Sequence, residues 1–179
     1  LSCSTKKEDI VVPNTESSLE IRIDDSAYKK LEGYRGVALK NGVIDKSLKK
    51  YVKATITYQG VNTLVKLRLK GDWVDHLKED KWSFRIKVPG DSAFLGLKSF
   101  SVQSPHTRSF LHEWFMHQVY LREGVLTTRY EFIPIIINGK QMGVYALEEH
   151  FDKQLVEAKG KREGPILKFN EEGVWETRV

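Results

Sequence analysis

The chain lacks several features that define whole classes of protein. It has one cysteine among 179 residues, so no disulfide can form within the chain. No apolar run approaches the roughly 20 residues that a membrane-spanning helix needs. A helical zinc motif places two histidines four residues apart. His112 and His117 are five apart, about 140° around a helix, and no other histidine spacing predicts a metal site.

The composition is that of one globular domain. Apolar residues make up 40% and charged residues 30%, and the length is sufficient to bury a core. The net charge of +5 suits an anionic partner such as a nucleotide, an acidic glycan or a membrane surface. A solvated basic surface explains the same charge without any partner, so composition alone does not decide between them.

The single cysteine stands near the start of the given sequence. Leu1, Ser2 and Cys3 resemble the last residues of a lipoprotein signal peptide, in which the cysteine receives the lipid. The residues that follow are polar, as a tether would be. We therefore expect a lipid on Cys3, a tether over 1–18, a folded domain over 19–179 and a secreted protein anchored at the bacterial cell envelope. A terminal cysteine of no consequence is the alternative.

Alternating apolar and polar residues predict a strand-rich domain. The expected strands cover 19–24, 51–58, 63–70, 82–88 and 97–103, with a short helix and loop over 25–50. In the third of these strands the apolar side chains face one side, and Lys66, Arg68 and Lys70 face the other. Lys87 lies on the corresponding face of the fourth strand. It is either part of a functional basic face or an ordinary lysine whose stem lies along the sheet.

A helix is expected over 104–123. Ser104 and Pro105 are typical of a helix start, and Gly124 is typical of a helix end. Glu113 falls beside the apolar stripe of this helix. At that position it either reaches across a cleft or is an ordinary exposed glutamate.

A hairpin is expected over 130–147. Its two strand-like runs flank Asn138-Gly139, the dipeptide that favours a two-residue turn. Glu148 and Glu149 come next, at the start of a short predicted helix where the helix dipole favours acidic residues. A last short strand carries Lys168.

These parts together resemble the N-terminal half of the spore coat protein H (CotH) kinase family, an atypical group of kinases. The corresponding segments are LKGDW (69–73), FRIKV (84–88), TRSFLHEWF (107–115), INGKQMGVYALEEHFDK (137–153) and GPILKF (164–169). Their order and spacing carry the resemblance, which covers more than half of the chain. It implies an α+β fold like the N-terminal lobe of a protein kinase, with a mainly antiparallel sheet and one long helix packed across it.

The resemblance also implies a nucleotide site. Lys87 would contact the phosphates of ATP, with Mg²⁺ as the metal, and Glu113 would hold that lysine in place. Leu147, Glu148 and Glu149 would form a hinge that reads the adenine through backbone groups. The other expected nucleotide contacts are Lys70, Gly71 and Lys168.

The chain departs from the family pattern in two respects. The turn has Asp72 where the family has asparagine, and a carboxylate repels phosphates. The catalytic and metal-binding aspartates of the family lie in a second lobe, downstream of the GPILKF-like strand. We therefore expect the metal ligands outside this chain, and no kinase activity from the chain alone.

The implied function is transfer of the γ-phosphate of ATP to a surface or secreted protein acceptor. One alternative is a non-catalytic interaction module at a cell surface or spore coat. Another is a glycan-binding module in which Trp73 and Trp82 form a platform. No nucleic-acid partner is expected.

Overall fold

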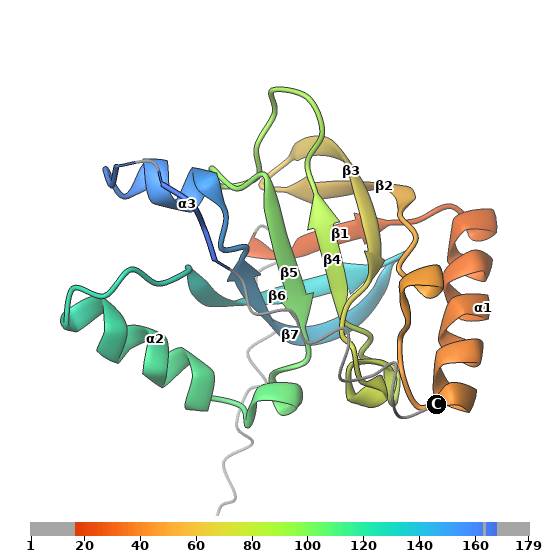
Figure 1. Ribbon diagram of the computed structural model, residues 1–179. Coiled ribbons are helices and arrows are strands. Elements are labelled where there is room, and N and C mark those ends of the chain that lie inside the picture. The colour runs from red at the N-terminus through yellow and green to blue at the C-terminus, as the bar shows by residue number, and fades with distance from the viewer. Residues whose placement is uncertain (1–16, 163, 168–179) are drawn as a thin grey trace, which may run out of the picture.

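The computed structural model describes residues 17–162 and 164–167, and in these ranges the chain forms a closed β-barrel (Figure 1). The strands are β1 (Leu19–Arg22), β2 (Val52–Tyr58), β3 (Val61–Leu69), β4 (Phe84–Lys87), β5 (Ser99–Gln103), β6 (Tyr130–Ile137) and β7 (Lys140–Glu149). The helices are α1 (Asp25–Asn41), α2 (His112–Arg122) and α3 (Lys153–Ala158), with the 3-10 helices η2 (Lys46–Leu48), η3 (Val74–Leu77) and η4 (Pro105–Arg108). No helix in the described ranges has the length and apolar character to cross a membrane.

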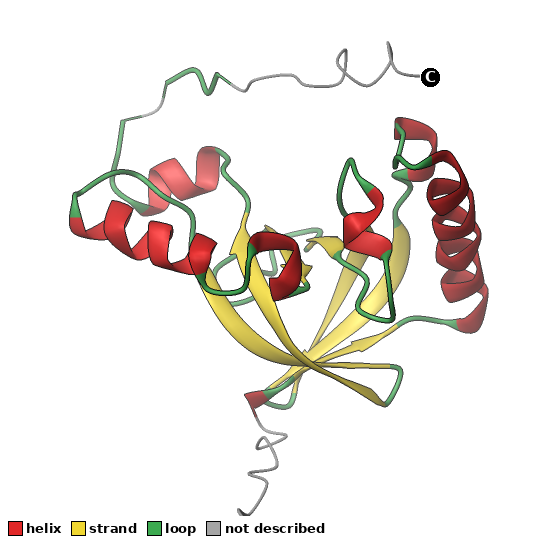
Figure 2. Cartoon of the chain, turned by 90° about the horizontal axis from the view of Figure 1, so that it is seen from below, coloured by secondary structure: helices red, strands yellow, loops and turns green. Residues whose placement is uncertain are grey.

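The barrel follows the strand order β1-β2-β3-β4-β5-β7-β6 and closes where β6 meets β1. The closing pair is parallel, with Leu19 opposite Ile135 and Ile21 opposite Ile137, and the other neighbouring strands are antiparallel. α1 lies on one side of the barrel, and α2 and α3 lie on the opposite side (Figure 2). Closure pairs the two strands that would be exposed edges in an open sheet.

Strand alternation places the apolar side chains inside the barrel. Val65, Leu67 and Leu69 of β3 are buried, which confirms the predicted apolar face of that strand. Phe84 and Ile86 of β4 lie opposite Leu69 and Leu67 and join the same core. Burial of this apolar surface is the main stabilising term of the fold.

The predicted fold class, an α+β kinase-like N-terminal lobe with one long helix packed across a mainly antiparallel sheet, is wrong. The sheet closes on itself through the parallel pair of β1 and β6, two strands that are far apart in the sequence. Alternation shows which face of a strand is apolar, but it does not show which distant strand becomes its neighbour. Closure of the barrel could therefore not be predicted from the alternation of apolar and polar residues.

The prediction of one long helix packed across the sheet is also wrong. Ser109 and Phe110 have left-handed backbone conformations, with φ of +50° and +59°, and they separate η4 from α2. Neither part contains a buried residue, so the apolar stripe of α2 is exposed to solvent. The longest helix of the described residues is α1, which continues through Gly33 and Gly36 where the sequence predicts a short helix and loop.

The predicted hairpin is confirmed. β6 and β7 pair on either side of Asn138-Gly139, whose φ values of +47° and +79° are those of a tight hairpin turn. Pro134 lies within β6, directly before the residues that pair with β1, and a bulge follows between Ile135 and Ile136. The missing N–H of proline is tolerated at such an irregular position.

Asn138 also connects the hairpin to the end of β1. Its backbone N–H donates to the carbonyl of Ile21 at 3.0 Å. Its side-chain oxygen accepts a hydrogen bond from the N–H of Ile23 at 2.8 Å, and its side-chain nitrogen donates to the carbonyl of Ile23 at 3.0 Å. These bonds hold the hairpin tip against the strand that closes the barrel.

Replacing Asn138 by glycine is expected to lower the free energy of unfolding by about 1–3 kcal/mol, because two hydrogen bonds across the closure are lost. Glycine accepts the left-handed backbone of this position, so the loss reports the side chain and not strain. Gln59→Gly is the matched control, since Gln59 has a φ of +49° in the turn between β2 and β3 and an exposed side chain. Urea unfolding measures both variants, and equal losses would contradict the role of Asn138.

Candidate functional site

Polar residues form a continuous row on the outside of the barrel. The register places Arg68 opposite Arg85, Arg85 opposite Ser101 and Ser101 opposite Glu148, across β3, β4, β5 and β7. Residues that lie opposite each other on paired strands point to the same face of a sheet. This row is therefore a shared outer face on which charged side chains lie close together.

Lys70, Gln103 and Glu148 form the centre of this face, which we call the Lys70 cluster. The ammonium of Lys70 lies 2.6 Å from Oε2 of Glu148 and donates a hydrogen bond to Oε1 of Gln103 at 2.5 Å. Lys70 is only 8% exposed, and Gln103 is fully buried. Lys70 directly follows β3, Gln103 ends β5 and Glu148 is the second-last residue of β7. The pairing of β4 with β3 and β5, and of β5 with β7, brings them together.

Burial acts on both charges of the ion pair. It lowers the pKa of Lys70, and the attraction of Glu148 offsets this only in part, while Arg85 and Arg108 repel the lysine charge. Burial alone would raise the pKa of Glu148. The charges of Lys70, Arg108 and Arg85 outweigh it and hold the pKa of Glu148 below its usual value. Glu148 is therefore the ionised, negative centre of a basic neighbourhood.

Groups from η4, α2 and β6 border the cluster. Nε of Arg108 lies 2.9 Å from Oε2 of Glu113. Burial, followed by the negative charge of Glu148, raises the pKa of Glu113. Burial also raises the pKa of Tyr130 to about 12, and the Tyr130 ring stacks on His117 with the ring centroids 5.1 Å apart. The cluster is thus bordered by a second acid, a further cation and a buried phenol.

Several buried polar atoms beside the cluster have no hydrogen-bond partner. They include Nε of Arg85 and Oε2 of Glu113. The contact between Arg108 and Glu113 is an ion pair without the alignment of a hydrogen bond, so the carboxylate oxygen has only a charge partner there. Buried polar atoms are nearly always hydrogen-bonded. A polar ligand or a water molecule at this place would complete the missing bonds.

Gly71 follows Lys70 and has a φ of +117°. A Cβ at this position would lie 2.6 Å from Cδ2 of His76, so the close packing of the histidine ring requires glycine. His76 is buried, and its Nδ1 lies 3.1 Å from the hydroxyl of Ser83. Asp72, the next residue of the turn, forms an ion pair with Lys49, which neutralises the carboxylate that would repel a phosphate.

The structure gives Lys87 and Glu113 separate partners. Lys87 is exposed on the outer face of β4, and its ammonium lies 5.3 Å from the centroid of the Tyr51 ring. Glu113 has the arginine of η4 as its partner. The lysine and the glutamate that do form an ion pair are Lys70 and Glu148, which the family resemblance implies to be nucleotide contacts.

The segment expected to be a hinge lies inside the sheet. Leu147 points into the barrel core, and the backbone at Leu147 and Glu148 is paired with β5 on one side and with β6 on the other. Glu149 accepts a hydrogen bond from the backbone N–H of Arg129 at 3.0 Å. The backbone groups that were expected to contact the adenine are therefore paired with the neighbouring strands of the barrel. The expected site residues outside the described ranges are Cys3 and Lys168, and their roles stay predictions.

Arg85, Gln103 and Tyr130 are part of the site although the sequence does not single them out. Arg85 shares the alternating face of Lys87, and that pattern was the available signal. Gln103 ends one strand and Tyr130 begins another, and neither has a local feature that marks it. Only the pairing of β7 with both β5 and β6 brings them to the same place.

Trp82 is not available as part of an open sugar platform. Its side chain is 8% exposed and stacks on Tyr28 with ring centroids 5.4 Å apart. The guanidinium of Arg35 lies 4.9 Å from the centre of the Trp82 ring. Trp73 is exposed, so a stacking platform would depend on that side chain alone.

A sequence comparison shows the family of this chain. The family model described as CotH kinase protein matches residues 67–177, which is more than half of the chain. The chain belongs to the CotH kinase family. This confirms the family resemblance of the motifs and gives the chain a kinase-related role. The matched segment of this CotH family member contains the whole Lys70 cluster, whereas β1, α1 and β2 precede it. No curated protein matches the chain.

Proposed function

We propose that the Lys70 cluster binds the phosphates of ATP in a CotH-type kinase that transfers the γ-phosphate to a surface or secreted protein. The observation that carries this proposal is the buried ion pair of Lys70 and Glu148. Catalysis of phosphoryl transfer depends mainly on positioning and charge stabilisation. A lysine whose ammonium is held by Glu148 and Gln103 supplies a positive charge at a fixed point.

The charges around the cluster support a phosphate as the ligand. Arg85 has a buried Nε without a hydrogen-bond partner, and a guanidinium is a suitable donor to phosphate oxygens. Arg108 adds positive charge, since it acts on both Lys70 and Glu148. The raised pKa of Glu113 favours its neutral form, which would reduce repulsion of an anion.

This proposal assigns two roles to other residues than the family resemblance did. Lys70 takes the phosphate contact that the resemblance gave to Lys87, and Glu148 takes the positioning role that it gave to Glu113. The reason is geometric, because Lys70 is buried and paired with the partly buried Glu148, whereas Lys87 is exposed.

The structure does not identify protein ligands for magnesium. In nucleotide sites Mg²⁺ is usually held by one or two protein carboxylates together with phosphate oxygens. Within the described ranges, no three His, Cys, Asp or Glu side chains lie together as ligands. A magnesium ion that arrives with ATP would neutralise phosphate charge. We propose that its protein ligands lie outside the described residues, so the residues of the Lys70 cluster act on the phosphates directly.

Calorimetric titration of the 179-residue chain with ATP tests the proposal. Lys70→Met is expected to weaken ATP binding by about 10–100-fold, because hydrogen bonds to charged groups contribute about 1.5–3 kcal/mol. Lys87→Met removes the same charge from the outer face of the barrel and is the matched control. It is expected to change the affinity less than about three-fold, as is usual for an exposed charge.

Circular dichroism and unfolding curves show whether each variant is folded before its affinity is compared. Arg85→Gln is the second variant, and it is also expected to weaken ATP binding while the Lys70–Glu148 pair stays intact. The proposal fails if the folded wild-type chain does not bind ATP, or if Lys87→Met and Lys70→Met weaken binding equally. Absence of binding would favour the interaction module, for which the exposed apolar stripe of α2 is the supporting observation.

A further inference from the structure

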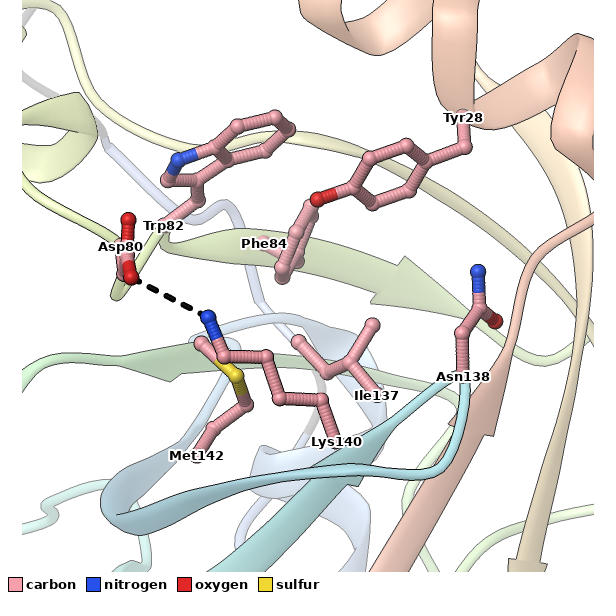
Figure 3. A pocket seen from close by; sticks show the side chains of 8 residues that line it. All are labelled: Tyr28, Asp80, Trp82, Phe84, Ile137, Asn138, Lys140 and Met142. Atoms are coloured by element: carbon pink, nitrogen blue, oxygen red, sulfur yellow. Dashed lines mark hydrogen bonds and ion pairs between the residues drawn. The ribbon is translucent and has the colours of Figure 1, made fainter.

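A pocket of about 240 Å³ lies where the tip of the β6–β7 hairpin approaches α1 and the segment before β4 (Figure 3). It is lined by Tyr28, Asp80, Trp82, Phe84, Ile137, Asn138, Lys140 and Met142. None of these residues belongs to the Lys70 cluster. The pocket is therefore a separate place on the molecule, and its ligand does not depend on the proposed nucleotide site.

The size of the pocket restricts its ligand. Sites for drug-sized molecules enclose about 300–1,000 Å³, so a nucleotide would not fit within this one. Figure 3 shows the rings of Tyr28 and Trp82 opposite the side chains of Ile137 and Met142. Aromatic, branched aliphatic and thioether groups favour an apolar ring as the guest. One ring-sized apolar group matches both the volume and the lining.

The rim of the pocket carries one acid and one base. Nζ of Lys140 lies 3.1 Å from Oδ2 of Asp80, and the two side chains are 65% and 83% exposed. An exposed ion pair of this kind contributes little to stability. It can therefore open at small cost, and each charge can then meet an opposite charge on a ligand.

We infer that this pocket binds a free aromatic α-amino acid as a zwitterion. The ring lies against Tyr28 and Met142, which are the partly exposed apolar lining residues, the ammonium pairs with Asp80, and the carboxylate pairs with Lys140. The inference joins three features of the pocket, namely its volume, its apolar lining and its two opposite rim charges.

Titration of the ¹⁵N-labelled 179-residue chain with L-tyrosine, followed by NMR chemical shifts, tests the inference. N-acetyl-L-tyrosinamide has the same ring but neither charge, and it is expected to bind at least about ten-fold more weakly. Asp80→Asn and Lys140→Gln are each expected to lower the affinity for L-tyrosine about ten-fold. Both positions are exposed, so these variants keep the fold. Glu157→Gln, which breaks an exposed ion pair on α3, is the matched control and is expected to leave the affinity unchanged.

Three results would overturn the inference. One is the absence of saturable shifts with L-tyrosine at pocket residues. Another is equal affinity for L-tyrosine and its capped amide, which would show that the rim charges are not used. The third is an Asp80→Asn or Lys140→Gln variant that binds L-tyrosine as tightly as the Glu157→Gln control.

Discussion

Replacing Glu148 by alanine is expected to cost about 3–5 kcal/mol of unfolding free energy, because it breaks a buried ion pair from one side. The substitution leaves the ammonium of Lys70, which is 8% exposed, without its carboxylate. Lys70 then remains beside Arg85 and Arg108, whose charges already lower its pKa. Urea unfolding at neutral pH measures the loss.

Removal of the lysine instead is expected to cost less, about 1–2 kcal/mol. In Lys70→Met, Glu148 keeps the attraction of Arg108 and Arg85, which help to hold its pKa low. The methionine also fills most of the volume of the lysine stem. The double variant Lys70→Met/Glu148→Leu is expected to regain most of the stability, since an apolar replacement of a buried ion pair is often neutral or stabilising.

Glu157→Ala on α3 is the control for this series. Its ion pair with Lys153 joins side chains that are 46% and 64% exposed, and such a pair contributes about 0–1 kcal/mol. A loss in Glu148→Ala no larger than that in Glu157→Ala would contradict the prediction. It would show that water compensates the charge of Lys70 in the absence of Glu148.

The strands and the hairpin could be predicted because their signals are local. The alternation around Val65, Leu67 and Leu69 identifies a strand and its buried face without knowledge of its neighbours. Asn138 and Gly139 identify a turn because their backbone conformations are open to few other residues. Such signals depend on residues within one strand or one turn, and the structure contains the strand and the turn that they predict.

The closed barrel and the broken helix could not be predicted, because their causes are not local. β1 pairs in parallel with β6, and four other strands lie between these two in the sequence. The periodicity between 104 and 123 is helical, but the left-handed conformations at Ser109 and Phe110 interrupt it. Neither residue type favours such a backbone, so its origin lies in the surrounding structure.

The candidate site was predicted in part. The basic face of β3 and β4 followed from alternation, and it contains both Lys70 and Lys87. Which lysine meets a glutamate depends on the register between β5 and β7, which places Glu148 opposite Ser101. The register between distant strands cannot be predicted from the alternation of residues within each strand. The motif order therefore located the face of the site but not its ion pair.

Acidification from pH 6.5 to pH 4.5 is expected to destabilise the protein through His76. Burial lowers the pKa of His76 from 6.5 to about 4, and the positive charges of Lys70 and Arg108 contribute in the same direction. Below pH 6.5 the unfolded chain binds a proton at this histidine that the folded protein does not bind. The free energy of unfolding then falls by up to about 1.4 kcal/mol per pH unit, which amounts to about 2–3 kcal/mol over the window.

The carboxylates of Glu148 and Glu113 act on the pH dependence with different signs, so wild-type data alone do not isolate the histidine. The lowered pKa of Glu148 contributes stability that is lost only as the pH falls through its folded pKa, below 4.5. The raised pKa of Glu113 acts in the opposite direction, because the folded protein binds that proton more readily than the unfolded chain. The quantity to compare is therefore the change in slope when His76 is replaced.

In His76→Gln, the decline between pH 6.5 and pH 4.5 is expected to become smaller by most of that 2–3 kcal/mol, because glutamine does not titrate. The absolute stability of the variant is not the readout, since the ring of His76 packs on Gly71 and its loss has a cost of its own. His106→Gln is the matched control, because His106 is an exposed histidine on η4. Urea unfolding at several pH values measures the slopes. If His76→Gln and wild type lose stability in parallel, the acid sensitivity comes from other groups, and His76 already takes up its proton in the folded protein.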